Sequence, residues 1–365
     1  MKKSKSAAIL MSVLMTAALA ACDSTSIPSV NNAETEPAQE TTGAVEENAI
    51  SSDEANKSET QAEGTSGDNK TRGPMDGNGG NRNGARGGMM SISNDPEIQT
   101  VLDENADKFQ QFTYEDKETG ITLEYSLYIP ENYDESQKYP LLMYIPDSTG
   151  AGKTASEIVK QYYGATVWVT DEDQAKHASF VLVPAFSETV VNDNWDVSEE
   201  VNALVNLLSQ LQKDYAIDSD RIYATGQSMG CMNSLYINSL YPSYFAASLF
   251  VSGQWDITEL KPLENETFFY ITAGGDERAS NGQDEVMDML NADGVKYTYG
   301  TWNAQNSSDE QNVAVEELLS ENLPINMIRF ETGTVFKEGE SGMEHMASFN
   351  YAYKISAVRD WLFEQ

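Results

Sequence analysis

Six short apolar runs, each followed by turn-forming residues, constrain the fold of this chain more than any other feature. They lie between residues 139 and 332 and read YPLLMYI, SFVLVPAF, RIYATG, FAASLFVSG, TFFYITAG and NMIRFET. Continuous apolar runs of this length are typical of strands that are buried on both faces of a mostly parallel sheet. Because parallel strands need long crossover connections, helices are expected between them, and the pattern predicts an α/β fold.

The clearest helical segment is DVSEEVNALVNLLSQLQKDY, residues 196–215. Asp196 and Glu199 suggest a capping arrangement at its start. Apolar residues recur along it at helical spacing and form one stripe of Val197, Val201, Leu204, Leu208, Leu211 and Tyr215. Upstream, QFTYED and ITLEYSLYI alternate apolar and polar residues around KETG, which predicts an antiparallel hairpin. We therefore predict a doubly wound, mostly parallel sheet with an N-terminal antiparallel hairpin.

The residues that follow each apolar run are the first place to look for chemistry, because doubly wound sheets bind ligands at the carboxyl ends of their strands. After RIYAT the chain reads Gly226-Gln227-Ser228-Met229-Gly230, between a predicted strand and a predicted helix. The pattern G-x-S-x-G in this context is that of a nucleophilic serine on a sharp strand-to-helix turn. The N-terminus of the helix also favours negative charge that develops beside the serine. Ser228 is therefore the candidate nucleophile.

A nucleophilic serine needs a base, and the chain contains only two histidines. His177 precedes Ser228 and lies at the start of a predicted strand, so we expect it at the opposite edge of the sheet, as a surface residue. His345 follows the last strand on a long loop and precedes the C-terminal helix, where this architecture places the base. Asp276, with Glu277 beside it, follows the strand TFFYITAG. We expect Asp276 to accept the imidazole N–H and to stabilise the imidazolium.

From about Phe112 to Gln365 the chain resembles secreted α/β-hydrolases of the predicted-peptidase or esterase type. The residues that carry the resemblance are YSLYIPENYDESQKYPLLMYIP, FVLVPAF, YAIDSDRIYATGQSMG and ITAGGDE. Related groups are the polyhydroxybutyrate depolymerase-like and feruloyl-type esterases, with a prolyl oligopeptidase-like catalytic domain. The resemblance implies a triad of Ser228, Asp276 and His345 and no metal or organic cofactor. It leaves open whether an ester bond or a peptide bond is cleaved.

One loop departs from the pattern of these enzymes. They usually carry His-Gly-x-Gly after the first central strand, whereas this chain has Pro146-Asp147-Ser148-Thr149. We expect the backbone N–H of Asp147 or Ser148, paired with that of Met229, to form the oxyanion hole. A carboxylate that faced the oxyanion would be unfavourable, so the side chain of Asp147 should point away or bind a polar group of the substrate. The departure keeps open an alternative, a non-catalytic ligand-binding lipoprotein on the same fold.

Three further residues, Trp195, Gln254 and Trp255, follow strand ends and are candidates for the substrate pocket. The two indoles suit an aromatic or a sugar group, but simple aromatic packing explains them equally well. Cys231 comes three residues after Ser228, and we expect it to be a core residue rather than a catalytic one.

The segment PDSTGAGKT, residues 146–154, matches the second half of a nucleotide-binding P-loop at Gly152, Lys153 and Thr154. A full P-loop needs glycine at the position of Asp147. A carboxylate there would repel phosphate, so nucleotide binding is disfavoured. The net charge of −35 likewise argues against a nucleic-acid partner.

The N-terminus predicts export. Residues 1–21 combine MKKSK, the apolar AAILMSVLMTAALA and small residues, and LAAC resembles a bacterial lipobox, which implies cleavage before Cys22 and a lipid on its sulfur. Residues 22–93 are poor in large apolar side chains, which predicts a disordered linker, first acidic and then rich in Gly and Asn. We therefore expect a hydrolase domain at 94–365, anchored outside the cytoplasm to the cell membrane. The expected substrates are small-molecule esters, polysaccharide-linked esters or peptides.

Overall fold

The computed structural model describes residues 95–365. The predicted export signal at 1–21, the lipidation site at Cys22 and the predicted linker at 22–93 lie outside the described residues. These three features therefore stay predictions.

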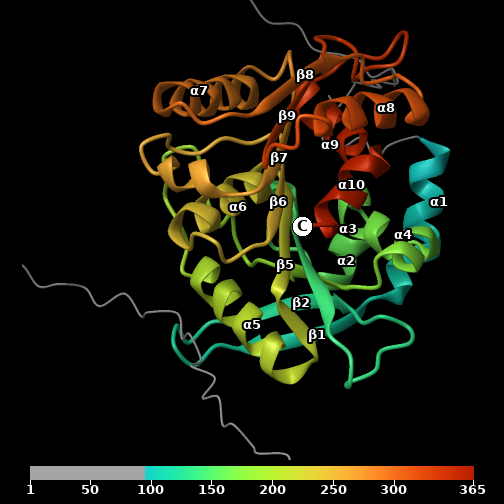
Figure 1. The fold of residues 1–365 in the computed structure, drawn as a ribbon. Helices are drawn as coiled ribbons and strands as arrows, with labels where there is room; N and C mark the ends of the chain where they lie inside the picture. The colour runs from blue at the N-terminus through green and yellow to red at the C-terminus, as the bar shows by residue number, and fades with distance from the viewer. Residues whose placement is uncertain (1–94) are drawn as a thin grey trace, which may run out of the picture. The chain divides into compact units, whose positions relative to one another are not determined.

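The described residues contain one sheet, in the order β1-β2-β4-β3-β5-β6-β7-β9-β8 (Figure 1). The strands are β1 (Gln110–Glu115), β2 (Thr122–Tyr128), β3 (Tyr139–Ile145), β4 (Phe180–Ala185), β5 (Ile217–Gln227), β6 (Ala247–Val251), β7 (Phe268–Ala273), β8 (Thr298–Trp302) and β9 (Ile325–Phe330). The pairs β1–β2 and β2–β4 are antiparallel, and all later neighbours are parallel. Each predicted strand and the predicted hairpin are present, so the prediction of the fold class is confirmed.

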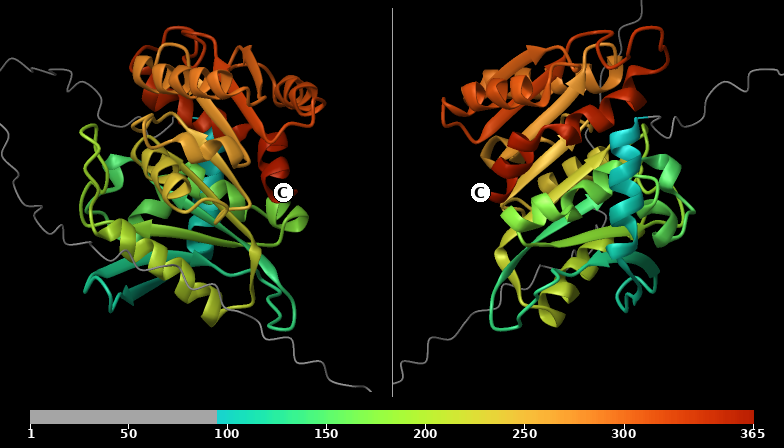
Figure 2. Two further views of the ribbon diagram at one scale, coloured as in Figure 1. Left: turned by 60° about the vertical axis from the view of Figure 1, so that its left-hand side comes forward. Right: turned by 90° about the vertical axis from the view of Figure 1, so that its right-hand side faces the viewer.

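Helices cover both faces of the sheet (Figures 1 and 2). On one face lie α5 (Glu200–Asp214), α6 (Met229–Leu240) and α7 (Glu277–Asp293). On the other lie α1 (Pro96–Asn105), α2 (Ala155–Val159), α3 (Tyr163–Thr166), α4 (Asp171–Lys176), α8 (Ser308–Leu319), α9 (Glu344–Lys354) and α10 (Ser356–Phe363). Short 3₁₀ turns occur at η1 (Ala106–Lys108), η2 (Ser148–Gly150), η3 (Val167–Val169) and η4 (Lys261–Asn265). The strands between the two layers are buried on both sides, as their apolar sequences require.

The start of α5 differs from the prediction. The helix begins at Glu200, and Glu199 before it makes no side-chain cap. Asp196 instead accepts a hydrogen bond from Asn192 in the preceding loop, a local contact that competes well with helix capping. Val197 lies in an isolated β-bridge and is 37% exposed, so it is not part of the helix. The central part of the predicted stripe is buried, namely Val201, Leu204, Leu208 and Leu211.

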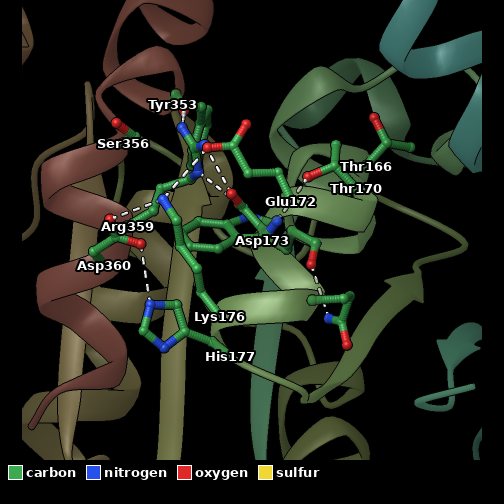
Figure 3. Close-up of polar contacts among 12 residues, drawn as sticks. Thr166, Thr170, Glu172, Asp173, Lys176, His177, Tyr353, Ser356, Arg359 and Asp360 are labelled. Carbon is green, nitrogen blue, oxygen red and sulfur yellow. Dashed lines mark hydrogen bonds and ion pairs between the residues drawn. The ribbon is translucent and has the colours of Figure 1, made fainter. Parts of the chain in front are cut away.

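A buried ion pair joins α4 to α10 (Figure 3). The guanidinium of Arg359 donates to both carboxylate oxygens of Asp173, over 2.7 and 3.0 Å, and its third nitrogen donates to the backbone carbonyl of Tyr353 over 2.6 Å. Both charged side chains are at least nine-tenths covered, and the bidentate geometry satisfies most of their hydrogen-bonding groups. Because Tyr353 lies in the last turn of α9, Arg359 also links α10 to the end of that helix.

The sheet has a topological switch point at β3, because its two neighbours β4 and β5 follow it in the chain on opposite sides. Ile145 pairs with Gly226 where β3 and β5 end. Asp147 and Ser228 therefore lie two residues beyond the last paired position of two adjacent strands. Open α/β sheets bind their ligands at this kind of position.

Candidate active site

Ser228 occupies a strained turn between β5 and α6. Its backbone has φ 52° and ψ −117°, a conformation that residues other than glycine rarely adopt. The flanking glycines are required by space: a Cβ on Gly226 would overlap the backbone of Gly230, and a Cβ on Gly230 would overlap the carbonyl oxygen of Ile145 in β3. The pattern G-x-S-x-G thus follows from the close approach of α6 to the ends of β3 and β5.

The structure brings Ser228, His345 and Asp276 together. His345 Nε2 lies 2.8 Å from Ser228 Oγ, and His345 Nδ1 lies 2.6 Å from Asp276 Oδ2. A carboxylate only accepts hydrogen bonds, so in the neutral ring Nδ1 carries the proton and Nε2 accepts from the serine hydroxyl. This arrangement can remove the serine proton and hold the resulting imidazolium beside a carboxylate.

Two of the three side chains follow strand ends directly, and the third lies at the start of a helix. Ser228 follows β5, and Asp276 follows β7 as the 94% buried N-cap of α7, where it also accepts from the backbone N–H of Ala279. His345 lies in the first turn of α9. The expectation that a long loop carries it is therefore wrong, because a helix does. The loop after β9 ends just before Glu344, where the helix begins. The helix gives the imidazole a firmer support than a loop would.

The carboxylate of Asp147 is turned into the interior and is only 3% exposed. Its Oδ2 accepts from Gln227 Nε2 over 2.9 Å, and its Oδ1 accepts from the hydroxyl of Tyr162 over 3.0 Å and from the backbone N–H of Thr149 over 2.8 Å. Gln227 in turn accepts from the hydroxyl of Tyr144 over 3.0 Å. Of the two arrangements expected from the sequence, the side chain adopts the one that points away from the substrate. The bond to Gln227 ties the loop after β3 to the residue that precedes Ser228.

The predicted oxyanion donors lie on adjacent segments. A Cβ on Gly230 would lie 2.9 Å from the carbonyl oxygen of Pro146, so the residue before Asp147 packs against the start of α6. Met229 begins that helix, and the first N–H groups of a helix have no partner within the helix. The backbone N–H groups of Asp147 or Ser148 and of Met229 therefore remain the candidates for the oxyanion hole.

Burial, and then the neighbouring carboxylate of Asp147, raise the pKa of Tyr162 well above its usual value. The phenol therefore stays protonated around neutral pH and can donate to Asp147. This bond satisfies part of the hydrogen-bonding capacity of a buried carboxylate, which would otherwise be strongly destabilising.

The residues that resemble a P-loop have other roles. The hydroxyl of Thr154 caps α2 and forms a capping box with Glu157. The ammonium group of Lys153 donates to Gln161 Oε1 over 2.6 Å and lies 5.7 Å from the centre of the Tyr162 ring. The helix that follows has only five residues, too short for the strong dipole that a phosphate site uses. These contacts give the loop a structural explanation that needs no nucleotide.

The three pocket candidates separate in the structure. Trp255 is only 2% exposed, and its indole N–H donates to Glu259 over 2.8 Å, so the prediction that it lines a pocket is wrong. Its large apolar ring is used in the core, where it meets the Trp195 ring edge to face at 5.3 Å. Trp195 is 38% exposed and has a positive φ of 66°. Gln254 donates to Asp193, which lies on the loop that carries Trp195. Trp195 and Gln254 remain candidates.

The other histidine and the cysteine lie outside this site. His177 stands before β4, as expected, but its ring is mostly covered: Nε2 lies 3.0 Å from Asp360 Oδ1 (Figure 3), and the ring stacks on Phe363. The prediction of a plain surface residue is therefore wrong, because the ring packs between α4 and α10. Cys231 is fully buried, and burial raises the pKa of its thiol, which fits the expected core role.

A hollow of about 520 Å³ lies along β8 and α8. Another, of about 490 Å³, lies between α1 and α9. Neither is lined by Ser228, Asp276 or His345. Over residues 95–365, no group of three or more His, Cys, Asp or Glu side chains is arranged to hold a metal ion. Within the same range, no helix has the length and apolar character needed to cross a bilayer.

Together, the mostly parallel sheet, the strained serine after β5 and the chain order Ser–Asp–His define the chain as an α/β-hydrolase by fold. A solved structure of a thermostable esterase shares this fold with a TM-score of 0.58 and 22% identity, over 72% of this chain and 64% of the other. No family model matches the chain.

Among curated proteins the chain is similar to acetylxylan esterase A from Aspergillus ficuum, with 26% identity over 155 residues. It is similar to the same extent to the probable acetylxylan esterase A of Aspergillus niger. Each match covers 40% of this chain and 46% of the relative, so the chain spans less than half the length of the curated relatives it matches.

Proposed function

We propose that this protein is a serine hydrolase that cleaves carboxylic esters through an acyl-enzyme. The observation that carries the proposal is the hydrogen-bonded series from Ser228 Oγ to His345 Nε2 and from His345 Nδ1 to Asp276, at 2.8 and 2.6 Å. The strained turn that presents Ser228 supports it. The similarity to proteins named as acetylxylan esterases favours an ester over a peptide.

In the proposed reaction, Ser228 Oγ attacks the ester carbonyl while His345 Nε2 takes the hydroxyl proton. Asp276 holds the imidazole in the correct tautomer and stabilises the imidazolium. The N–H of Met229 and that of Asp147 or Ser148 stabilise the oxyanion. The imidazolium then protonates the leaving alcohol, and a water molecule, activated by the same imidazole, hydrolyses the acyl-enzyme.

For the substrate we propose an acetyl or other short acyl ester, either of a small molecule or on a polysaccharide. The test compares release of acetate from acetylated xylo-oligosaccharides with release of p-nitroaniline from aminoacyl and prolyl p-nitroanilides. We expect kcat/KM for the esters to exceed that for the amides by at least about 100-fold, and Ser228→Ala to abolish the ester activity. Cleavage of an anilide without cleavage of any ester would instead support the peptidase alternative.

We also propose that the protein is lipid-anchored at Cys22, outside the cytoplasm. The support is the sequence alone, because residues 1–22 lie outside the described part of the chain. Replacing Cys22 by Ala should move the protein from the membrane fraction to the soluble fraction of an expressing bacterium. If wild type and Cys22→Ala fractionate alike, the proposed anchor is wrong.

A further inference from the structure

One acidic side chain outside the Ser–His–Asp series touches both of the loops that flank it. Glu344 is the first residue of α9 and directly precedes His345. Its Oε2 accepts from the backbone N–H of Gly275 over 2.9 Å, and its Oε1 accepts from the backbone N–H of Gly333 over 2.8 Å. Gly275 directly precedes Asp276 in the chain. A single carboxylate therefore connects the segment that supplies the base with the segment that supplies the acid.

The sheet explains how one carboxylate reaches both amides. Strands β7 and β9 are adjacent and parallel, and their last residues Ala273 and Phe330 are paired. The loops that begin after these residues therefore leave the sheet side by side. Gly275 lies in the first loop and Gly333 in the second. Their N–H groups face a common point, and the Glu344 carboxylate occupies it.

The absence of a side chain at residue 275 is part of this arrangement. A Cβ on Gly275 would overlap the carboxylate of Glu344. Gly275 does not have a left-handed φ, so conformation alone does not require glycine there. The requirement comes from the space that the Glu344 carboxylate fills.

The contact with Gly333 closes the loop before α9 at its base. Residues 334–343 lie between the two joined positions, and the N-cap Met343 makes no side-chain cap. At the other side of the first turn, the hydroxyl of Ser348 donates to the His345 carbonyl over 2.9 Å and lies 2.8 Å from the Ser252 hydroxyl. Within the described residues, Glu344 is thus the side chain that holds the N-terminal end of α9 to both loops. A carboxylate in the first turn also interacts favourably with the helix dipole.

We propose that Glu344 is a positioning residue, which fixes the distance between His345 and Asp276 by joining their two segments through the Gly275 and Gly333 amides. The expected loss of kcat rests on the proposed function. The expected change in the distance between His345 and Asp276 does not. A base that is displaced by about 1 Å can lose about 100-fold in rate, although it contacts the substrate no differently.

The test uses the whole chain with Glu344→Ala, Gly275→Ala and the double variant, and Glu340→Ala as the matched control. Glu340 lies in the loop between β9 and α9. Its carboxylate accepts from the backbone N–H of Lys337, within the same loop. We expect Glu344→Ala to lower kcat on p-nitrophenyl acetate by about 10- to 100-fold with KM changed less than about threefold. Gly275→Ala should do the same by displacing the carboxylate. The double variant should be no worse than Glu344→Ala, because the space that the new Cβ needs is then free.

A second readout does not depend on turnover. The Nδ1 proton of His345, held by Asp276, should give a downfield proton NMR signal, which His177→Ala would leave in place and thereby assign. We expect this signal to broaden or disappear in Glu344→Ala and to persist in Glu340→Ala. Retention of the signal in Glu344→Ala, or kcat within about twofold of wild type in an active enzyme, would overturn the proposal. If the wild type shows the signal and its loss in Glu344→Ala but cleaves no ester, the positioning role holds and the proposed function fails.

Discussion

Replacing His345 by alanine should lower kcat/KM for an ester by roughly 10⁴- to 10⁶-fold, because residues of a Ser–His–Asp unit act together and the loss of the base leaves little beyond binding and the oxyanion hole. The expectation follows from the 2.8 Å contact with Ser228 Oγ and the 2.6 Å contact with Asp276. Initial rates on p-nitrophenyl acetate, measured at a temperature at which wild type and variant are both folded, give this ratio of kcat/KM directly.

The chain supplies its own control, since it contains only one other histidine. His177 contacts Asp360 and Phe363 and no residue of the candidate site. His177→Ala should therefore keep kcat within about threefold of wild type, even where its melting temperature falls slightly. Equal losses in the two variants would show that a folding defect, and not removal of the base, explains the result.

Replacing Gly230 by alanine should destabilise the fold severely. The added Cβ would overlap the carbonyl oxygen of Ile145 and lie 2.9 Å from that of Pro146, both backbone atoms at the end of central strand β3. Backbone of a buried strand cannot move aside as a flexible side chain can, so α6 would have to shift with Ser228 at its start. We expect a loss of at least about 3 kcal/mol in the free energy of unfolding, which for a domain of this size lowers the melting temperature by about 6–12 °C.

A matched substitution separates this clash from a general cost of replacing glycine. A Cβ on Gly342 would meet only the Phe336 ring at ordinary contact distance, and this glycine has no left-handed φ. Gly342→Ala should therefore change the melting temperature by no more than about 2 °C. The close packing of α6 on β3 would be contradicted if Gly230→Ala melted as Gly342→Ala does.

The fold could be predicted from the sequence because its strongest signal is chemical and local. Buried parallel strands must be apolar on both faces, and six such runs marked the sheet from Tyr139 onward. The alternating pattern on either side of KETG predicted the antiparallel hairpin in the same way. Ser228 was found because the sharp turn requires glycine at 226 and 230, which leaves a pattern in the sequence.

The rest depended on contacts between segments far apart in the chain. Asp147 is buried only because Gln227 and Tyr162 reach it from two other elements, and a sequence does not show which side chain a buried carboxylate will meet. Trp255 looked like a pocket residue because it follows a strand, whereas its ring fills the core. Glu344 had no signal at all, since its role depends on two backbone amides in loops that the sheet brings together.

The inward orientation of the Asp147 carboxylate also changes what can be inferred from the absence of the His-Gly-x-Gly pattern after β3. The loop after β3 does not present a negative charge to the oxyanion, and its tie to Gln227 keeps that loop against the turn that carries Ser228. The departure from the usual sequence is therefore compatible with a working oxyanion hole. It no longer favours a non-catalytic binding protein.

The central claim is that Ser228 is a nucleophile activated by His345, and covalent labelling tests it most directly. A fluorophosphonate probe reacts preferentially with a serine that an adjacent base activates in this way. We predict that the wild-type chain gains the mass of one probe, that the modified peptide maps to Ser228, and that Ser228→Ala and His345→Ala are not labelled. A wild-type protein that stays unlabelled while folded, or a Ser228→Ala variant that is labelled as fast as wild type, would contradict the account.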